Sequence, residues 1–174
     1  MRINNRRRMN WAQAGSAPIK RTPAISPARA NGCCASDFVA RLIVDTGFSV
    51  ALYIRGDALH KAAVECLRRG TETLITTTAV VVETCFFLDA AGKHEFLGWI
   101  GRGGMDIHEI PADNYPEIAW YIEKYADQDI GFADATLVWL ANRIGERRIL
   151  TVDETDFSIY RLKGNKRFEM VPWY

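Results

Sequence analysis

The stretch Arg41-Leu-Ile-Val-Asp45 places three large apolar residues directly before a carboxylate. A short, uninterrupted apolar run is typical of a strand that is buried on both faces, as in a parallel sheet. A second run of the same form, Arg148-Ile-Leu-Thr-Val-Asp153, also ends in aspartate. The two runs therefore predict parallel strands, each with an acid at its carboxyl end, although an aspartate in either place could simply begin a loop.

Helical and extended patterns alternate between and around these two strands. Further strands are expected over residues 73–76, 105–110 and 168–171, and helices over 57–69, 79–91, 94–100, 113–126 and 134–144. Gly92 and Gly145 are expected to end the helices that precede them. Strands that alternate with helices indicate an α/β fold in which helices cover both faces of a parallel sheet.

The composition fits one globular domain. The chain has 174 residues, of which 48% are hydrophobic and 25% charged, which suffices for one ordinary core. No apolar run approaches the roughly 20 residues that a membrane span requires. The basic N-terminus also lacks the apolar stretch of a signal peptide, so we expect a cytoplasmic protein without a membrane segment.

Charge is distributed unevenly along the chain. Residues 1–38 contain seven Lys or Arg and one acid, whereas the remainder contains 15 basic and 20 acidic residues. The first segment is rich in Asn, Pro, Ser and Ala and lacks a hydrophobic period, so it is expected to be a disordered basic tail or an upstream extension outside the natural product. The folded domain is expected over 39–174, and its surplus of acids requires an explanation such as a metal site.

Glu83 is the most informative acid. It lies within Ala79-Val-Val-Val-Glu-Thr-Cys-Phe-Phe-Leu88, and a helix that is apolar on nearly every face is expected to be buried. A buried carboxylate costs several kcal/mol unless it is paired or bound to a cation. No Lys or Arg stands three or four residues away on either side. A metal ion is therefore the favoured partner, with a distant ion pair as the alternative.

Asp134 completes a set of four acids at the edges of core elements. It lies at the expected start of a helix, in Gly131-Phe-Ala-Asp-Ala-Thr-Leu-Val-Trp-Leu140, where an acid could also simply complement the helix dipole. Four carboxylates suit Mg²⁺ or Mn²⁺, which can activate water for attack on a phosphodiester. The other usual ligand types show no metal-ligand spacing: His60, His94, His108, Cys33, Cys34, Cys66 and Cys85.

Four segments together resemble the PIN domain and, more narrowly, the VapC-type toxins of VapBC toxin–antitoxin pairs. They are Ile43-Val-Asp-Thr-Gly-Phe-Ser-Val-Ala-Leu52, Thr78-Ala-Val-Val-Val-Glu-Thr84, Phe132-Ala-Asp-Ala-Thr-Leu-Val138 and Leu150-Thr-Val-Asp-Glu-Thr-Asp-Phe157. The resemblance covers about residues 40–174. It implies a three-layer α/β/α fold with a small central parallel sheet, and RNA cleavage that depends on Mg²⁺ or Mn²⁺. It also implies a homodimer, and inhibition by a cognate antitoxin whose C-terminal segment covers the acidic groove.

The same resemblance assigns roles to individual residues. The catalytic and metal-binding acids fall on Asp45, Glu83, Asp134 and Asp153. Thr46 matches the hydroxyl residue that lies by the metal, and Asp156 matches a more variable auxiliary position. The basic tail has no counterpart in the family.

Other functions remain as alternatives. An aspartate-nucleophile phosphohydrolase would carry a second acid where this chain has Gly47, and the glycines of Gly101-Arg-Gly-Gly104 precede a strand rather than follow one as dinucleotide binding requires. A non-catalytic module that binds RNA or a partner, and a housekeeping RNA-processing nuclease, remain open. Candidate RNA contacts, which could equally be ordinary solvated surface, are Arg55, Lys93, Arg102, Arg147, Arg148, Arg161, Lys163, Lys166 and Arg167.

Overall fold

A parallel sheet lies at the centre of the structure, a computed structural model that describes residues 40–174. The expected tail over residues 1–38, with Cys33 and Cys34, lies outside the described residues. The strands are β1 (Arg41–Val44), β2 (Thr73–Thr77), β3 (Asp106–His108), β4 (Arg148–Leu150) and β5 (Glu169–Met170). Their order is β3-β2-β1-β4-β5 and every pair is parallel, which confirms the α/β class and makes β1 and β4 neighbours.

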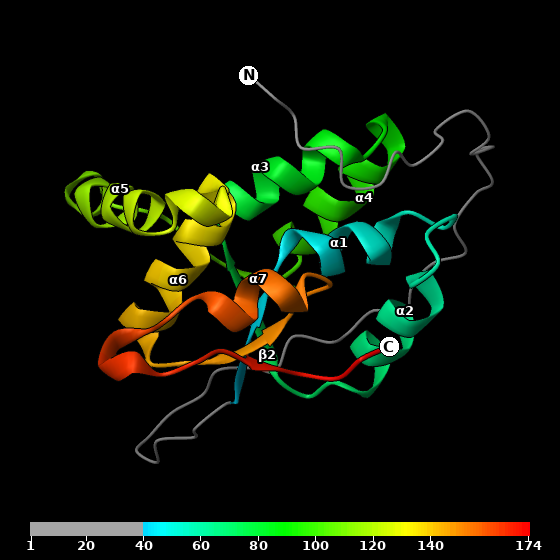
Figure 1. Ribbon diagram of the computed structural model, residues 1–174. Helices are drawn as coiled ribbons and strands as arrows, with labels where there is room; N and C mark the ends of the chain where they lie inside the picture. The colour runs from blue at the N-terminus through cyan, green and yellow to red at the C-terminus, as the bar shows by residue number, and fades with distance from the viewer. Residues whose placement is uncertain (1–39) are drawn as a thin grey trace, which may run out of the picture. The chain divides into compact units, whose positions relative to one another are not determined.

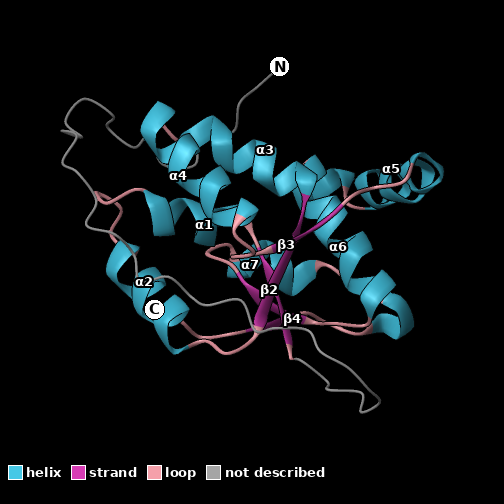
Figure 2. Cartoon of the chain, turned by 180° about the vertical axis from the view of Figure 1, so that it is seen from behind, coloured by secondary structure: helices cyan, strands magenta, loops and turns pink. Residues whose placement is uncertain are grey.

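Helices cover both faces of this sheet. They are α1 (Thr46–Tyr53), α2 (His60–Arg69), α3 (Thr78–Phe87), α4 (Ala90–Gly101), α5 (Tyr115–Lys124), α6 (Phe132–Ile144) and α7 (Glu154–Ile159). Figures 1 and 2 show α6 and α2 on opposite sides of the strands, with α1 and α3 beside each other at one end. No helix of the described residues is long and apolar enough to cross a membrane.

Side chains alternate along the central strand and so build two cores. Ile43 faces a core shared with α5, α6 and α7, whereas Leu42 and Val44 face a second core with α1 and α2. Successive residues of a strand point to opposite faces, so a run that is buried on both faces must be apolar at every position. This arrangement confirms the three-layer α/β/α fold.

Two helices, α1 and α7, were not expected from the sequence. Each begins directly after a strand-terminal acid whose side chain caps it: Asp45 accepts from the Thr46 N–H at 2.6 Å and Asp153 from the Asp156 N–H at 3.2 Å. These N-caps satisfy backbone donors that a short helix would otherwise leave unpaired. The two strand-terminal acids therefore also have a structural role.

The helical region after β2 is divided differently from expectation. Helix α3 ends at Phe87, and Gly92, which was expected to end it, lies inside α4. The expectation was wrong because Asp89 caps a new helix by accepting from the Gly92 N–H at 2.7 Å. The other expected terminator, Gly145, does end its helix, α6, with a left-handed φ of 75°.

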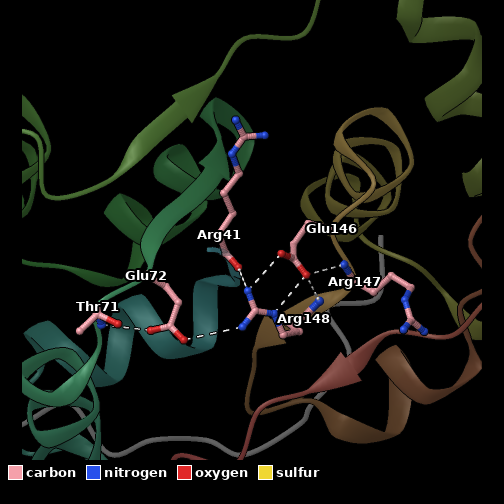
Figure 3. A network of polar contacts seen from close by, with 6 residues as sticks. All are labelled: Arg41, Thr71, Glu72, Glu146, Arg147 and Arg148. Carbon is pink, nitrogen blue, oxygen red and sulfur yellow. Dashed lines mark hydrogen bonds and ion pairs between the residues drawn. The ribbon is translucent and has the colours of Figure 1, made fainter. Parts of the chain in front are cut away.

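The amino ends of β1, β2 and β4 are joined by a network of polar contacts made of Arg41, Glu72, Glu146, Arg147 and Arg148, called here the amino-edge cluster (Figure 3). The Arg148 guanidinium donates to the Arg41 carbonyl oxygen at 2.6 Å and lies 3.3 Å from Glu146 and 3.7 Å from Glu72. Partial burial acts to raise the pKa of Glu146, but hydrogen bonds from Arg148 and from two backbone N–H groups lower it overall. The cluster therefore ties β4 to β1 and to the start of β2.

Candidate functional site

Four acids named from the sequence lie at the opposite, carboxyl end of the sheet, where ligands bind in open parallel sheets. They are called here the edge acids: Asp45, Glu83, Asp134 and Asp153. Asp45 follows β1, Asp153 follows the β4 segment, and Asp134 lies in the first turn of α6. The charges of the other three edge acids, and of Asp156, all act on the pKa of Asp134, so the structure brings the set together.

Hydrogen bonds hold the carboxylate of Asp45 in a defined direction. Its side chain is 5% exposed, one oxygen accepts from the Thr46 N–H, and the other accepts from the Thr151 hydroxyl at 2.8 Å. Burial raises the pKa of Asp45 to about 6 although these hydrogen bonds act to lower it, and the charge of Glu83 raises it further. The carboxylate is therefore fixed in direction and costly to ionise without a cation.

Glu83 joins the site through Thr46. The Thr46 hydroxyl donates to a Glu83 carboxylate oxygen at 2.5 Å, while the Thr46 N–H binds Asp45, so this one residue links two edge acids. The expectation that Glu83 is buried was wrong, because its side chain is exposed. Helix α3 buries Val80 and Thr84 and leaves Phe86 82% exposed. An apolar sequence predicts burial only when enough neighbours exist to cover every face.

The pKa of Asp134 is raised further than that of Asp45. Burial, followed by the charges of Asp45, Glu83, Asp153 and Asp156, raises the pKa of Asp134 to about 8. A helix N-terminus favours a negative charge, so the position in the first turn of α6 acts in the opposite direction and does not compensate. Bringing several carboxylates together in this way is favourable when a cation neutralises them.

Thr151 is a site residue that the sequence reasoning missed. Its hydroxyl donates to Asp45 and accepts from the Asp153 N–H at 2.9 Å, so it bridges the ends of β1 and β4. The available signal was a hydroxyl two residues before the second strand-terminal acid, in Thr151-Val-Asp153. Asp156, the auxiliary acid, lies in the first turn of α7 beside Asp153. The expected place of Thr46 beside a metal ion stays a prediction.

Several basic side chains named as RNA contacts have structural partners. Arg147 and Arg148 lie in the amino-edge cluster, at the other end of the sheet from the edge acids. Arg161 donates to three carbonyl oxygens at the end of α7, and Lys163 lies 3.6 Å from Glu117. A role in RNA binding for these residues stays a prediction.

The chemistry of the donor set fits a hard divalent cation. Carboxylate and hydroxyl oxygens are the ligands that Mg²⁺ and Mn²⁺ prefer, and the raised pKa values of Asp45 and Asp134 reflect negative charge that a cation would stabilise. In the part of the chain that the structure describes, no three His, Cys, Asp or Glu side chains are already gathered tightly enough to hold a metal ion. The fit therefore rests on ligand type and charge.

Comparisons with known proteins identify the family of this chain. The PIN domain family matches residues 42–163. A curated relative, Ribonuclease VapC26 from Mycobacterium tuberculosis (strain ATCC 25618 / H37Rv), is 30% identical over 135 residues, covering 75% of this chain and 100% of the relative. The crystal structure of Mycobacterium tuberculosis VapC20, a Sarcin-Ricin loop cleaving toxin, superposes with a TM-score of 0.61 at 20% identity, covering 66% of this chain and 91% of that one.

Proposed function

Because this chain belongs to the PIN domain family, in its VapC-type branch, we propose that it is an endoribonuclease that hydrolyses RNA at the edge acids with Mg²⁺ or Mn²⁺. The proposal rests on one observation above all. Thr46 links Asp45 to Glu83 by two hydrogen bonds, and the charges of both acids act on the buried Asp134 in the first turn of α6. A bound cation would reduce the repulsion between these carboxylates and the phosphate of RNA.

The chain's own groups hold the site in a defined arrangement. Thr46 and Thr151 fix both oxygens of Asp45, and Thr46 also directs Glu83. Asp134 is carried by α6, a helix whose middle residues are almost entirely buried, so this carboxylate moves little relative to the sheet. A bound Mg²⁺ or Mn²⁺ would supply Lewis-acid polarisation of the phosphate and a more acidic water. Asp45 at the end of a strand and Asp134 in the first turn of a helix are on rigid elements, which suits residues that would hold a metal ion.

The biological role that we propose is that of the toxin in a type II toxin–antitoxin pair acting in the cytoplasm. In support, the whole length of a VapC ribonuclease aligns with this chain, and all four edge acids are present. A housekeeping RNA-processing nuclease and a non-catalytic PIN-like module are the alternatives. The first would have no adjacent antitoxin gene, and the second would not cleave RNA.

An antitoxin segment is the partner that we propose for the exposed face of α3. A cavity of about 420 Å³ connects Glu83 with the apolar side chains of Val82, Phe86 and Phe132. Exposed apolar area of this kind is characteristic of protein interfaces. A segment with apolar side chains in this groove and a positive charge near Glu83 would cover the edge acids and block RNA. Phe86→Glu should then weaken antitoxin binding while RNA cleavage is retained.

RNA cleavage by the purified full chain tests the proposed activity. Total RNA is incubated with Mg²⁺, with Mn²⁺, or with EDTA, and Asp45→Asn is assayed beside the wild type. We expect cleavage that requires the metal and is lost in the variant. Absence of cleavage by folded, metal-loaded wild type on total RNA and on isolated tRNA and ribosomal RNA would favour the binding module. Sedimentation of the same sample tests the predicted homodimer.

A further inference from the structure

Two exposed aromatic rings lie next to the edge acids. Phe132, the first residue of α6, stands two positions before Asp134 and lines the cavity of about 420 Å³ that also contains Glu83. The side chain of Phe132 is 44% exposed, and its ring stacks on that of Tyr115, the first residue of α5, which is 51% exposed. Contiguous exposed apolar surface marks an interaction site, so this pair calls for a ligand.

The geometry of the pair favours a flat ligand. The planes of the Tyr115 and Phe132 rings are only 20° apart, with centroids 6.2 Å apart. Buried ring pairs of this protein meet edge to face instead, for example Phe48 with Trp173 at 79° and Phe157 with Phe168 at 86°. Nearly parallel exposed rings can extend a stack to a third flat group, and unpaired nucleobases bind proteins by stacking on aromatic side chains.

A second cavity, of about 190 Å³, adjoins the same turn of α5. The side chains that line it are Asn114, Glu117, Trp139, Arg143 and Lys163. The Arg143 guanidinium lies over the Trp139 ring, 5.4 Å from its centroid, and the Lys163 ammonium group lies 3.6 Å from a Glu117 carboxylate oxygen. Two cations and one carboxylate leave a positive balance, which suits the phosphate of a nucleic acid.

We propose that Phe132 and Tyr115 bind an unpaired base of the RNA next to the cleaved phosphodiester, and that Arg143 and Lys163 bind a phosphate further along the same strand. The two cavities give this order, because Phe132 lines the first with Glu83 and the neighbour of Tyr115 in sequence lines the second. The edge acids themselves repel the RNA backbone, so affinity has to come from such flanking contacts. The inference rests on the proposed function, because it takes RNA to be cut at the edge acids.

RNA binding by the full chain tests the stacked pair. Every variant carries Asp45→Asn, so that a fluorescein-labelled RNA of randomised sequence, about ten nucleotides long, is bound without being cut. Fluorescence anisotropy measures its dissociation constant in Mg²⁺. Tyr115→Ala should weaken binding about 5–150-fold, the effect of losing one stacked base, whereas Tyr115→Phe keeps the ring and should bind like its parent.

Trp120→Ala is the matched control. Trp120 is an aromatic residue of the same helix with a similar exposure of 52%, but it stands five positions after Tyr115 and so faces another side of α5. Its removal should leave RNA binding unchanged. Arg143→Gln should weaken binding and lower the salt dependence by about one phosphate contact, a change that a purely structural role would not produce.

The inference is overturned if Tyr115→Ala binds RNA as tightly as its parent, or if Trp120→Ala weakens binding equally. It is also overturned, in favour of a contact between two copies of this chain, if Tyr115→Ala changes sedimentation but not RNA binding. Cleavage by the wild type separates the two kinds of failure. If the wild type cleaves RNA, these results refute this inference alone, whereas a wild type without cleavage refutes the proposed function and this inference with it.

Discussion

Carboxylates are treated in opposite ways at the two ends of the sheet. At the amino end, Glu146 and Glu72 lie beside Arg148, and hydrogen bonds lower the pKa of Glu146. At the carboxyl end, burial and neighbouring acids raise the pKa of Asp45 and of Asp134. The first arrangement favours the ionised form and stabilises the fold by itself. The second disfavours ionisation of Asp45 and Asp134, a cost that a bound cation would offset.

The difference between the two ends of the sheet helps to distinguish acids that stabilise the fold from acids that serve a functional site. The acids of both ends lie beside strands, so position along the chain does not separate them. The amino-edge cluster contains its own compensating charge, whereas Asp45 and Glu83 accept hydrogen bonds from the hydroxyl groups of Thr151 and Thr46, which carry no charge. Orientation without neutralisation is what a metal-dependent site requires.

The largest expected effect is the loss of cleavage on replacing an edge acid. Asp45→Asn should reduce RNA cleavage by more than the roughly 10–100-fold that loss of an outer hydrogen-bond partner costs. Asp106→Asn, the same substitution at the amino end of β3, is the control and should cleave normally. Equal activities of the two variants in a single-turnover assay would remove the distinction between the two edges.

A smaller effect is expected at Thr151, which orients Asp45. Thr151→Val removes the hydroxyl and keeps the shape, so Mg²⁺ affinity should fall about 10-fold, within the range for outer hydrogen-bond partners of metal ligands. Calorimetric titration of the variant and the wild type with Mg²⁺ measures this affinity. An affinity equal to that of the wild type would mean that the hydrogen bond to Asp45 serves only the fold.

Arg148→Ala should affect stability rather than catalysis. The variant loses the bond to the Arg41 carbonyl oxygen and removes a positive partner of Glu146, which should cost about 1–3 kcal/mol of unfolding free energy. The neighbour Arg147→Ala loses a half-exposed pair with Glu169 and should cost about 0–1 kcal/mol. Urea unfolding measures the unfolding free energies of the two variants. A loss of metal affinity in Arg148→Ala would show that the edges are coupled.

Glu146→Gln should have the smallest effect. It should lower the unfolding free energy by less than about 1 kcal/mol, because the ion pair between Glu146 and Arg148 is partly exposed. Its pH dependence identifies the cause. The pKa of Glu146 is lowered in the folded state, so its contribution is present above the unfolded pKa and is lost as the pH falls through the folded value. The variant should therefore be less stable than the wild type at pH 7 and equally stable at pH 2. A difference that persists at pH 2 would point to packing.

The sequence predicted most of what local patterns determine. The runs over β1 and β4 were recognised because every position in them is apolar, which follows from burial on both faces. The two acids were expected at the carboxyl ends of those strands because each directly follows its run. Helices α1 and α7 were missed because they have only eight and six residues, too few for a helical period to be recognised.

What the sequence could not provide depends on contacts between distant segments. Thr151 matters because it meets Asp45, 106 residues earlier in the chain. The exposure of Glu83 was missed for a related reason, since the number of elements that cover α3 is a property of the whole fold. The assignment of the edge acids as catalytic stays a prediction until it is measured.

Thermal unfolding between pH 4 and pH 9, with and without Mg²⁺, tests the central claim most directly. The folded pKa values of Asp45 and Asp134 are raised to about 6 and about 8, so their stabilising contribution is complete below about pH 4 and is lost as the pH rises through those values. The account predicts that the metal-free chain loses stability toward pH 9 and that Mg²⁺ restores it most strongly there. Stability that is independent of both pH and Mg²⁺ over this range would contradict it.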